Sequence, residues 1–424
     1  MDTTGKSRLS QFWNHLQHEL FPFLREEDHL ALSPALEQVI RVLEFTQIER
    51  FIPSSRGCVG RPPQDRVALA RAFVAKAVLD LPTTEALIDR LQVDRSLRRI
   101  CGFERFHAIP DASRFSRVFA EFTALALPAR VHEALIRAQL GDQLIGHIAR
   151  DATEIEAREK PAAKAAAVAT APAGLFAEAT VVDAASAAAA EPVPAPAKQR
   201  GRPRKGEERP KALTVIERQV DHSAAASLAQ LPTACDVGSK KNSKGFKETW
   251  TGYKLHIDTA DGDIPVTAIL TSASVHDSQA AIPLMRLTGE RVTYLYDLAD
   301  AAYCSGVIRA VSRQEGHVPL IDHNARRGEK IAFAPHEAER YQVRSQAERV
   351  NSLLKDNHGG RHVRVRGAPK VYTHLMFGIL VIAAEQILRL LNEPSCLPTT
   401  WETPSGGISL WPENRINPCR YSGI

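Results

Sequence analysis

The apolar residues along the first 140 positions recur at three- and four-residue intervals, which is the spacing of amphipathic helices. The segment 64–79 shows this spacing directly after a Gly-Arg-Pro-Pro breaker. A threonine pair at 83–84 can cap a short helix, a turn at 93–94 precedes another, and Pro110 opens a longer helix that reaches about residue 139. We therefore predict an all-α N-terminal domain over residues 1–140.

Two short helices flank the turn at 93–94, and this arrangement has two interpretations. It can be a helix-turn-helix that reads DNA in the major groove, or it can be an ordinary packed helix pair. The sequence leaves both open. A DNA-binding role for the N-terminal domain is therefore a hypothesis.

After residue 140 the pattern changes to short apolar runs bounded by turn residues, which is typical of strands. Residues 143–150 predict a short strand that delivers Asp151 at its end. Further strands are expected at 251–257, 264–270, 292–298 and 318–321, and helices at 278–287, from 305, at 337–356 and at 371–391. This order indicates an α/β fold with a mixed sheet flanked by helices.

The composition changes abruptly after the first of these strands. Residues 161–200 contain eighteen alanines and cannot offset the entropy of ordering, so we predict a flexible Ala/Pro-rich insertion over 157–212. It divides the second domain into residues 141–156 and 213–392, and a C-terminal tail, 393–424, carries no interpretable pattern.

A basic run near the end of the insertion contains Arg200 and Arg202 in the order Arg-Gly-Arg-Pro. The run resembles an AT-hook, in which arginines enter a narrow minor groove. A basic solubilising linker is an equal alternative. We interpret it as a DNA-binding arm or such a linker.

The bulk composition, 44% hydrophobic and 24% charged, is that of a soluble globular protein. A net charge of +5 is compatible with a polyanionic partner but does not identify one. The six cysteines form no Cys-x-x-Cys pair, which argues against a zinc module and for reduced thiols in the cytoplasm. No signal peptide is predicted, and the apolar run 375–384 spans only about half a bilayer, so we expect a buried helix and no membrane partner.

The stretch 341–355 carries the densest chemistry. On a continuous helix, Tyr341, Arg344, Glu348 and Lys355 would fall within roughly 60° of one another. The opposite side would present apolar residues to a sheet, namely Ala347, Val350, Leu353 and Leu354. A solvated helix face can show the same geometry, so the spacing itself has to separate the two interpretations.

The spacing of these four residues resembles the Y-x2-R-x3-E-x6-K signature of the DDE transposases of bacterial insertion sequences, and it matches at every signature position. Asp151-Ala-Thr is similar to that family's first Asp motif, and Asp300-Ala-Ala-Tyr303 is similar to the second. Three further segments resemble the family, at 252–256, 273–278 and 363–367. Apart from the insertion, the resemblance runs from about 60 to 391.

The resemblance implies a ribonuclease H-like fold in which Asp151, Asp300 and Glu348 are catalytic and bind two Mg²⁺ or Mn²⁺ ions. Carboxylate oxygens are what such hard cations require. Asp297 lies near the same strand end as Asp300, but Tyr303 follows Asp300 at the family spacing, which favours Asp300.

The remaining signature residues would then bind DNA. Arg344 and Lys355 could hold phosphates near the scissile bond, and Tyr341 could stack on an extruded base or bond a phosphate. Arg364 and Arg366 belong to a basic strip after the catalytic helix that suits element-end DNA. For each of them a plain surface contact is the alternative.

The function implied is that of a transposase that cuts at the ends of its element and joins the 3′-hydroxyls to target DNA. Its partner would be double-stranded DNA, which it would bind as a homodimer in the bacterial cytoplasm, associated with the nucleoid. Two alternatives stay open: a metal-dependent nuclease without strand transfer, and a non-catalytic DNA-binding protein that retains the fold. The presence of all three carboxylates argues against the second.

Overall fold

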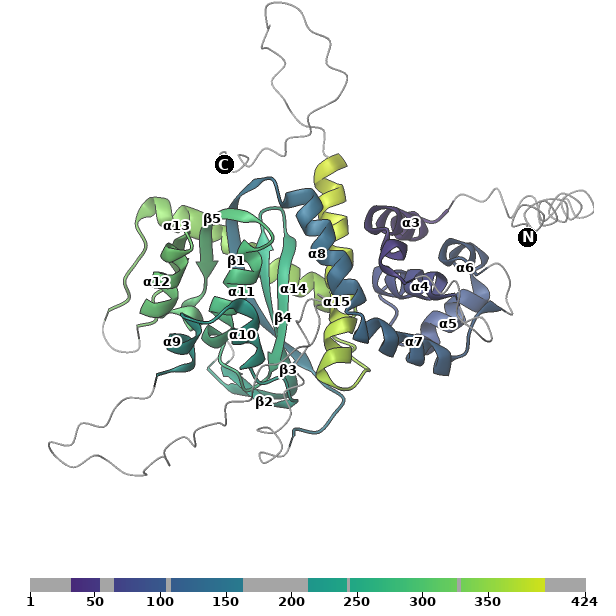
Figure 1. Cartoon of the computed structure of the whole chain (residues 1–424), viewed down its shortest axis with the longest axis horizontal. Coiled ribbons are helices and arrows are strands. Elements are labelled where there is room, and N and C mark those ends of the chain that lie inside the picture. Colours follow the sequence, from purple (N-terminus) through teal and green to yellow (C-terminus); the bar gives the residue numbers. More distant parts are fainter. Residues whose placement is uncertain are drawn as a thin grey trace, which may run out of the picture.

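The computed structural model describes residues 32–53, 65–103, 108–162, 213–241, 245–325 and 329–392. Arg200 and Arg202 lie outside the described residues, as do the insertion from residue 163 and the tail 393–424. The described chain forms a helical N-terminal part and a sheet flanked by helices (Figure 1).

Short helices are the regular elements of the described chain before residue 141. They are α3 (Pro34–Thr46), the 3-10 helix η1 (Ile48–Phe51), α4 (Arg66–Val78), α5 (Thr84–Val93), α6 (Arg95–Cys101), α7 (Ala112–Ala124) and α8 (Leu127–Leu140). Thr83 caps α5 by accepting a hydrogen bond from the Ala86 amide at 3.0 Å. The predicted long helix over 110–139 is wrong, because Ala126 adopts a left-handed conformation (φ 47°) that separates α7 from α8.

Six strands form one mixed sheet. They are β1 (Leu144–Glu156), β2 (Asp236–Lys241), β3 (Lys247–Ala260), β4 (Ile264–Ser272), β5 (Thr293–Ala299) and β6 (Val318–Ile321). The order is β2-β3-β1-β5-β6, and β4 pairs with the part of β3 that β2 leaves free. Strands β2, β3, β4 and β1 pair antiparallel, whereas β5 and β6 run parallel to β1. This mixed sheet with flanking helices confirms the expected ribonuclease H-like fold.

The first strand is longer than predicted. Strand β1 continues to Glu156, so Asp151 lies in its middle and not at its end. The extension pairs with β3 through residues such as Ile155, opposite Tyr253. Gly252 makes this pairing possible, because a Cβ there would lie 2.1 Å from the carbonyl oxygen of Ile155. Such long-range pairing is invisible in the local apolar pattern.

The remaining helices cover the sheet. They are α9 (Val215–Gln219), α10 (Ala224–Ala229), α11 (Ser278–Gly289), the 3-10 helix η3 (Ala301–Tyr303), α12 (Gly306–Gln314), α13 (Pro335–Tyr341), the 3-10 helix η4 (Gln342–Arg344), α14 (Ser345–Asn357) and α15 (Ala368–Asn392). The predicted continuous helix over 337–356 is therefore wrong, since η4 interrupts it between α13 and α14. Within α14 the predicted apolar back is present: Ala347, Val350 and Leu354 are buried, and Leu353 is half-buried.

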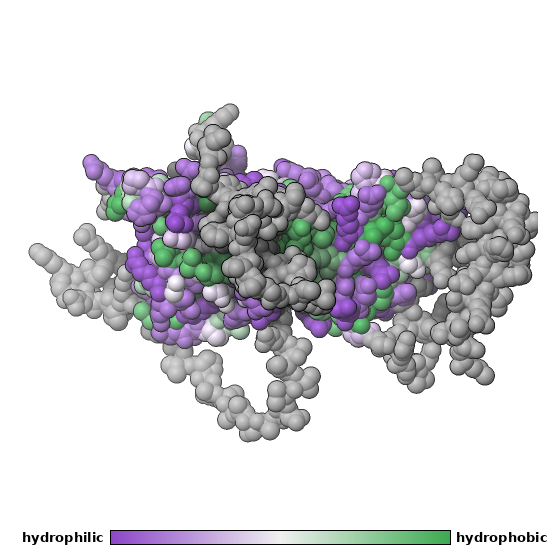
Figure 2. All heavy atoms as spheres, turned by 90° about the horizontal axis from the view of Figure 1, so that it is seen from above, coloured by the Kyte–Doolittle hydropathy of each residue, from purple (hydrophilic) through white to green (hydrophobic). Residues whose placement is uncertain are grey.

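Helix α15 joins the two parts of the molecule. It is long and apolar enough to cross a membrane, but it packs on β4 and α14 on one side and on α3, α4 and α7 on the other (Figure 1). Its Phe377 ring lies 5.7 Å from Phe73 of α4 and 6.4 Å from Phe119 of α7. The expected buried helix is therefore confirmed as α15. Figure 2 shows hydrophilic side chains over much of the described surface seen from above.

Candidate functional site

Strands β1 and β5 bring Asp151 and Asp300 side by side. The parallel pairing places Arg150 opposite Ala299. Asp151 follows Arg150 in the sequence, and Asp300 follows Ala299. Neighbouring strands lie about 4.8 Å apart, so the two carboxylates meet at the same edge of the pairing. The negative charge of Asp300 acts on Asp151.

Asp151 is a partly buried carboxylate with an unusual protonation equilibrium. Burial raises its pKa to about 6, and the charge of Asp300 acts in the same direction. The Nδ2 group of Asn351 donates a hydrogen bond to Oδ2 of Asp151 at 2.9 Å and acts in the opposite direction. The negative charge is therefore less stable here than on an exposed aspartate.

Asp300 directly follows β5 and caps the short helix η3. Its Oδ1 accepts from the Ala302 amide at 3.0 Å, which fixes one carboxylate oxygen. Burial raises the pKa of Asp300, and the nearby Asp277 carboxylate adds to the effect. Tyr303 is buried beside these carboxylates, and its hydroxyl has no hydrogen-bond partner among the described residues.

One face of α14 lies along β1. Asn351 binds Asp151, and one turn later Lys355 donates from Nζ to Oε1 of Glu154 at 2.9 Å. Although burial opposes it, hydrogen bonds from Lys240 and Lys355 lower the pKa of Glu154 to about 2. Lys355 is therefore held by a carboxylate in this structure.

Sequence reasoning missed Asn351. The residue is buried and contacts Asp151 directly, yet its type carries no signal of its own. The available signal was its position three residues after Glu348, on the same helix face.

Glu348, the third predicted carboxylate, does not join Asp151 and Asp300 in one cluster of described residues that could hold a metal ion. Its side chain is 57% exposed and pairs with Arg344, four residues earlier. The Arg344 charge also acts on Asp151 and on Asp300, so the guanidinium is within electrostatic reach of all three carboxylates. Arg344 thus joins the predicted residues into one cluster without bringing Glu348 against the aspartates.

Tyr341 is half-buried at the end of α13, across the break from α14. Its ring packs on Phe333 at 4.7 Å, and its hydroxyl donates to the Ala299 carbonyl at 3.4 Å. Burial raises its pKa to about 12. The residue therefore lies beside the strand end that carries Asp300, although it does not share one continuous helix with Glu348.

Asp297 has a different role from Asp300. It is fully buried, and its Oδ1 accepts from Arg150 at 2.9 Å. The same guanidinium donates to Oδ2 of Asp258 at 2.7 Å, and Thr288 donates to that oxygen as well. Arg150 and its two aspartates form a buried charge cluster, here called the Arg150 clamp. A carboxylate already neutralised inside the core is poorly suited to catalysis, which favours Asp300.

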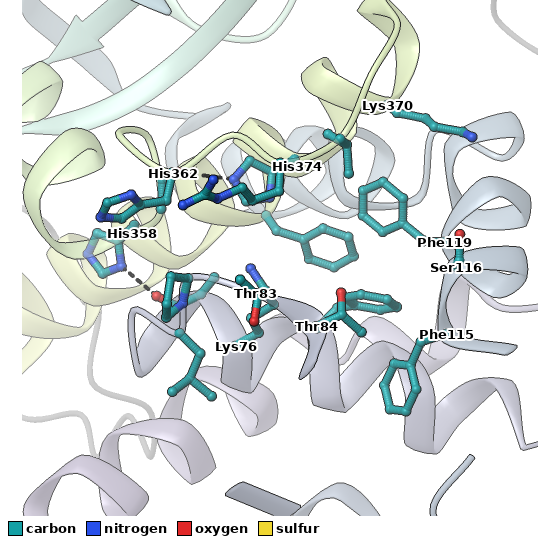
Figure 3. A pocket seen from close by; sticks show the side chains of 18 of the residues that line it. Lys76, Thr83, Thr84, Phe115, Ser116, Phe119, His358, His362, Lys370 and His374 are labelled. Carbon is teal, nitrogen blue, oxygen red and sulfur yellow. Dashed lines mark hydrogen bonds between the residues drawn. The ribbon is translucent and has the colours of Figure 1, made fainter. Parts of the chain in front are cut away.

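Arg364 and Arg366 lie away from the aspartates. Both line a cavity of about 330 Å³ between α4, α5 and α7 on one side and the α14–α15 connection and α15 on the other (Figure 3). None of the catalytic candidates lines this cavity. The Nε group of Arg366 donates to the Arg158 carbonyl at 3.0 Å.

The side chains around Asp151 and Asp300 provide some of the ligands that a divalent cation needs. Among the described residues, no three His, Cys, Asp or Glu side chains lie close enough together to hold a metal ion. Oxygen donors nevertheless converge: the carboxylates of Asp151 and Asp300, and the Oδ1 atom of Asn351, which is buried without a hydrogen-bond partner in the described chain. Hard cations such as Mg²⁺ prefer these donors, and a cation would relieve the cost of the two buried charges.

Comparison with protein families agrees with the geometry. The model of the transposase DDE domain matches residues 143–383, more than half of the chain, and the model of a transposase domain (DUF772) matches residues 19–121. No curated protein and no solved structure gave a match. The chain therefore belongs to the DDE transposases of insertion sequences, enzymes that act on DNA.

Proposed function

We propose that this transposase cleaves DNA at the ends of its insertion sequence and joins the freed 3′-hydroxyls to target DNA. The observation that carries the proposal is the juxtaposition of Asp151, in the middle of β1, with Asp300, directly after β5, beside the α14 face that bears Glu348. The family matches support a DNA substrate. We propose a homodimer on double-stranded DNA in the bacterial cytoplasm.

Asp151, Asp300 and Glu348 would hold two Mg²⁺ or Mn²⁺ ions. When bound, a pair of such cations makes the attacking oxygen more nucleophilic and takes up charge on the departing oxygen. Asn351 orients Asp151 through its 2.9 Å hydrogen bond. The backbone amide of Ala302 orients Asp300 in the same way.

Arg344 would exchange partners when DNA binds. In this structure its guanidinium forms an ion pair with Glu348. A phosphate near the scissile bond would be a competing bidentate partner for Arg344, and its binding would release the Glu348 carboxylate towards Asp151 and Asp300. Lys355 would likewise exchange Glu154 for a phosphate, while Tyr341 would contact the bases beside the strand end.

Among the remaining predicted DNA contacts, Arg364 and Arg366 line a cavity that holds none of the catalytic candidates. Arg364 and Arg366 would follow the backbone of the element end, and Arg200 and Arg202 would add minor-groove affinity. Their positive charge is the support for this part of the proposal.

The test is cleavage of duplex DNA that carries the element's own ends, in Mg²⁺, by the wild type and by Glu348→Gln. The substitution removes a metal-binding charge while nearly preserving shape, so cleavage should fall by at least about 100-fold while end binding persists. Glu339→Gln is a matched control, because it removes the same charge from an exposed position on α13.

Each outcome separates the candidate functions. Cleavage without joining of pre-nicked ends would indicate a nuclease. Binding without cleavage by the wild type would indicate a non-catalytic DNA-binding protein. Equal activity of wild type and Glu348→Gln would show that Glu348 is an ordinary solvated helix residue.

A further inference from the structure

The cavity at the junction of the two parts of the chain has a strongly one-sided charge. Its lining includes Lys76 from α4 and four basic residues from the α14–α15 connection and the start of α15, namely His362, Arg364, Arg366 and Lys370. Within the described chain no aspartate or glutamate lines it. Lysine and arginine side chains from elements nearly 300 residues apart in sequence meet at this cavity without a carboxylate in its lining, and such an arrangement favours an anion.

Lys76 is the deepest cation of this cavity. Its ammonium group faces the space below His362 and His374 (Figure 3). Burial lowers its pKa to about 8, and the charge of Asp80 only partly opposes this. Among the described residues Lys76 forms no ion pair, and Oδ1 of the nearby Asp80 accepts from the Gly359 amide at 3.0 Å. A half-buried lysine without a carboxylate partner is costly unless an anion binds it.

Hydroxyl groups and a helix end complete the wall opposite the arginines. Thr83, Thr84 and Ser116 line the cavity, and the first two begin α5, a helix of ten residues (Figure 3). The amino end of a helix and neighbouring hydroxyls both stabilise a phosphate. These groups add to a cluster of cations that already selects an anion.

We propose that this junction cavity binds a phosphate of the DNA backbone on Lys76 of the helical part, while Arg364 and Lys370 of the sheet-bearing part hold neighbouring phosphates at its rim. The inference rests on the proposed action on DNA and assigns a particular contact to it. Arg364, Arg366 and Lys370 are exposed at the rim, where a polymer with successive phosphates can engage several of them. A free anion would engage only the interior.

The experiment measures binding of element-end duplex as a function of salt, for wild type and for the double variant Arg364→Gln/Lys370→Gln. Both substitutions are at exposed positions, so the fold should be preserved, which circular dichroism can check. Loss of phosphate contacts should reduce the slope of log K against log salt by about 0.9 for each contact and weaken binding roughly tenfold. Arg313→Gln is the control, because it removes a charge from exposed α12 at the opposite end of the molecule (Figure 1).

A second variant, Lys76→Met, tests the interior of the cavity. It should lower affinity for duplex DNA and raise thermal stability in the absence of DNA, because it removes a half-buried charge. Inorganic phosphate at constant ionic strength serves as the competitor. If millimolar phosphate does not displace DNA, the result supports a site for the DNA backbone. If phosphate displaces DNA, the cavity is a site for a free anion and the proposal is overturned.

The failures are distinguishable. If the wild type cuts DNA and the double variant keeps the wild-type salt slope, only the junction site is wrong. If the wild type binds no duplex DNA, the junction site and the proposed function are both wrong.

Discussion

Two neighbouring residues of β1, Arg150 and Asp151, are both charged and buried at least in part, but their surroundings differ. Arg150 lies on one face of the sheet, where Asp258 and Asp297 neutralise it at 2.7 and 2.9 Å. Asp151 lies on the other face, where burial and Asp300 raise its pKa to about 6. The first charge is neutralised by two ion pairs, whereas the second has a hydrogen bond from Asn351 and the more distant charge of Arg344, and no ion pair within the described chain. The difference teaches that a buried charge indicates a functional site only where the protein does not itself neutralise it.

The largest expected effect comes from the Arg150 side. Arg150→Met would leave the buried carboxylates of Asp258 and Asp297 without their cation, which should lower the free energy of unfolding by about 3–5 kcal/mol. Urea unfolding followed by circular dichroism measures it. The triple variant Arg150→Met/Asp258→Asn/Asp297→Asn should recover part of the lost free energy of unfolding. If Arg150→Met alone is as stable as wild type, the Arg150 clamp does not contribute to stability.

A pH-dependent effect is expected on the same face of the sheet. His256 is fully buried, and its Nε2 atom forms a hydrogen bond with Oγ1 of Thr271 at 2.9 Å. Burial lowers the pKa of His256 to about 4. The charges of Lys254 and Arg150 act in the same direction, and the charge of Asp277 opposes them. The unfolded chain protonates near pH 6.5 and the folded chain does not. Stability is therefore complete above pH 6.5 and falls as the pH drops towards 4, by up to about 3 kcal/mol from this group.

The check on this effect compares unfolding of wild type and His256→Gln across pH 4–8. The two curves should converge in shape above pH 6.5, and the wild type should lose more stability below it. Parallel curves over the whole range would mean that His256 titrates normally.

On the Asp151 side, Asn351→Ala should raise the Mg²⁺ concentration needed for half-maximal cleavage by roughly 10-fold, because Asp151 loses the hydrogen bond that orients it. A magnesium titration of cleavage measures this. Ser352→Ala, at an exposed position on the same helix, is the control. Unchanged metal dependence with reduced maximal rate would argue for a direct DNA contact instead.

The smallest expected effect concerns Lys355. Its pair with Glu154 is shared with Lys240, so Lys355→Met should cost less than about 1 kcal/mol of stability while weakening DNA binding. Thermal unfolding and a DNA-binding titration separate the two effects. Lys240→Met should change stability similarly and leave cleavage intact, and equal loss of cleavage in both variants would remove the special role of Lys355.

Local patterns predicted the elements well where the elements are local. Strand β6 was predicted at its observed bounds, and Thr83 is one of the two caps considered for α5. The break at η4 was missed because apolar spacing continues on both sides of it. The length of β1 was missed because it depends on pairing with a strand about 100 residues away.

The candidate site was predictable only as residue types in order. The spacing singled out Asp151, Asp300 and Glu348, but it could not reveal that Arg344 neutralises Glu348 in this structure. Nor could it reveal that Asp297 belongs to the Arg150 clamp, since that assignment requires the register of β1 and β5. Contacts between distant segments decide these points, and a single sequence does not contain them explicitly.

The placement of α15 has a consequence for how this enzyme can evolve. One continuous hydrophobic core runs from Leu36 and Phe73 through Phe119 and Phe377 to Ile387, so the helical part and the sheet share the same interior. An exchange of the end-recognition part for that of a distant relative would leave α15 with an unmatched surface. New target or end specificity is therefore expected to arise by substitution on the exposed faces, and recombination of whole modules at this boundary should produce unfolded chimaeras.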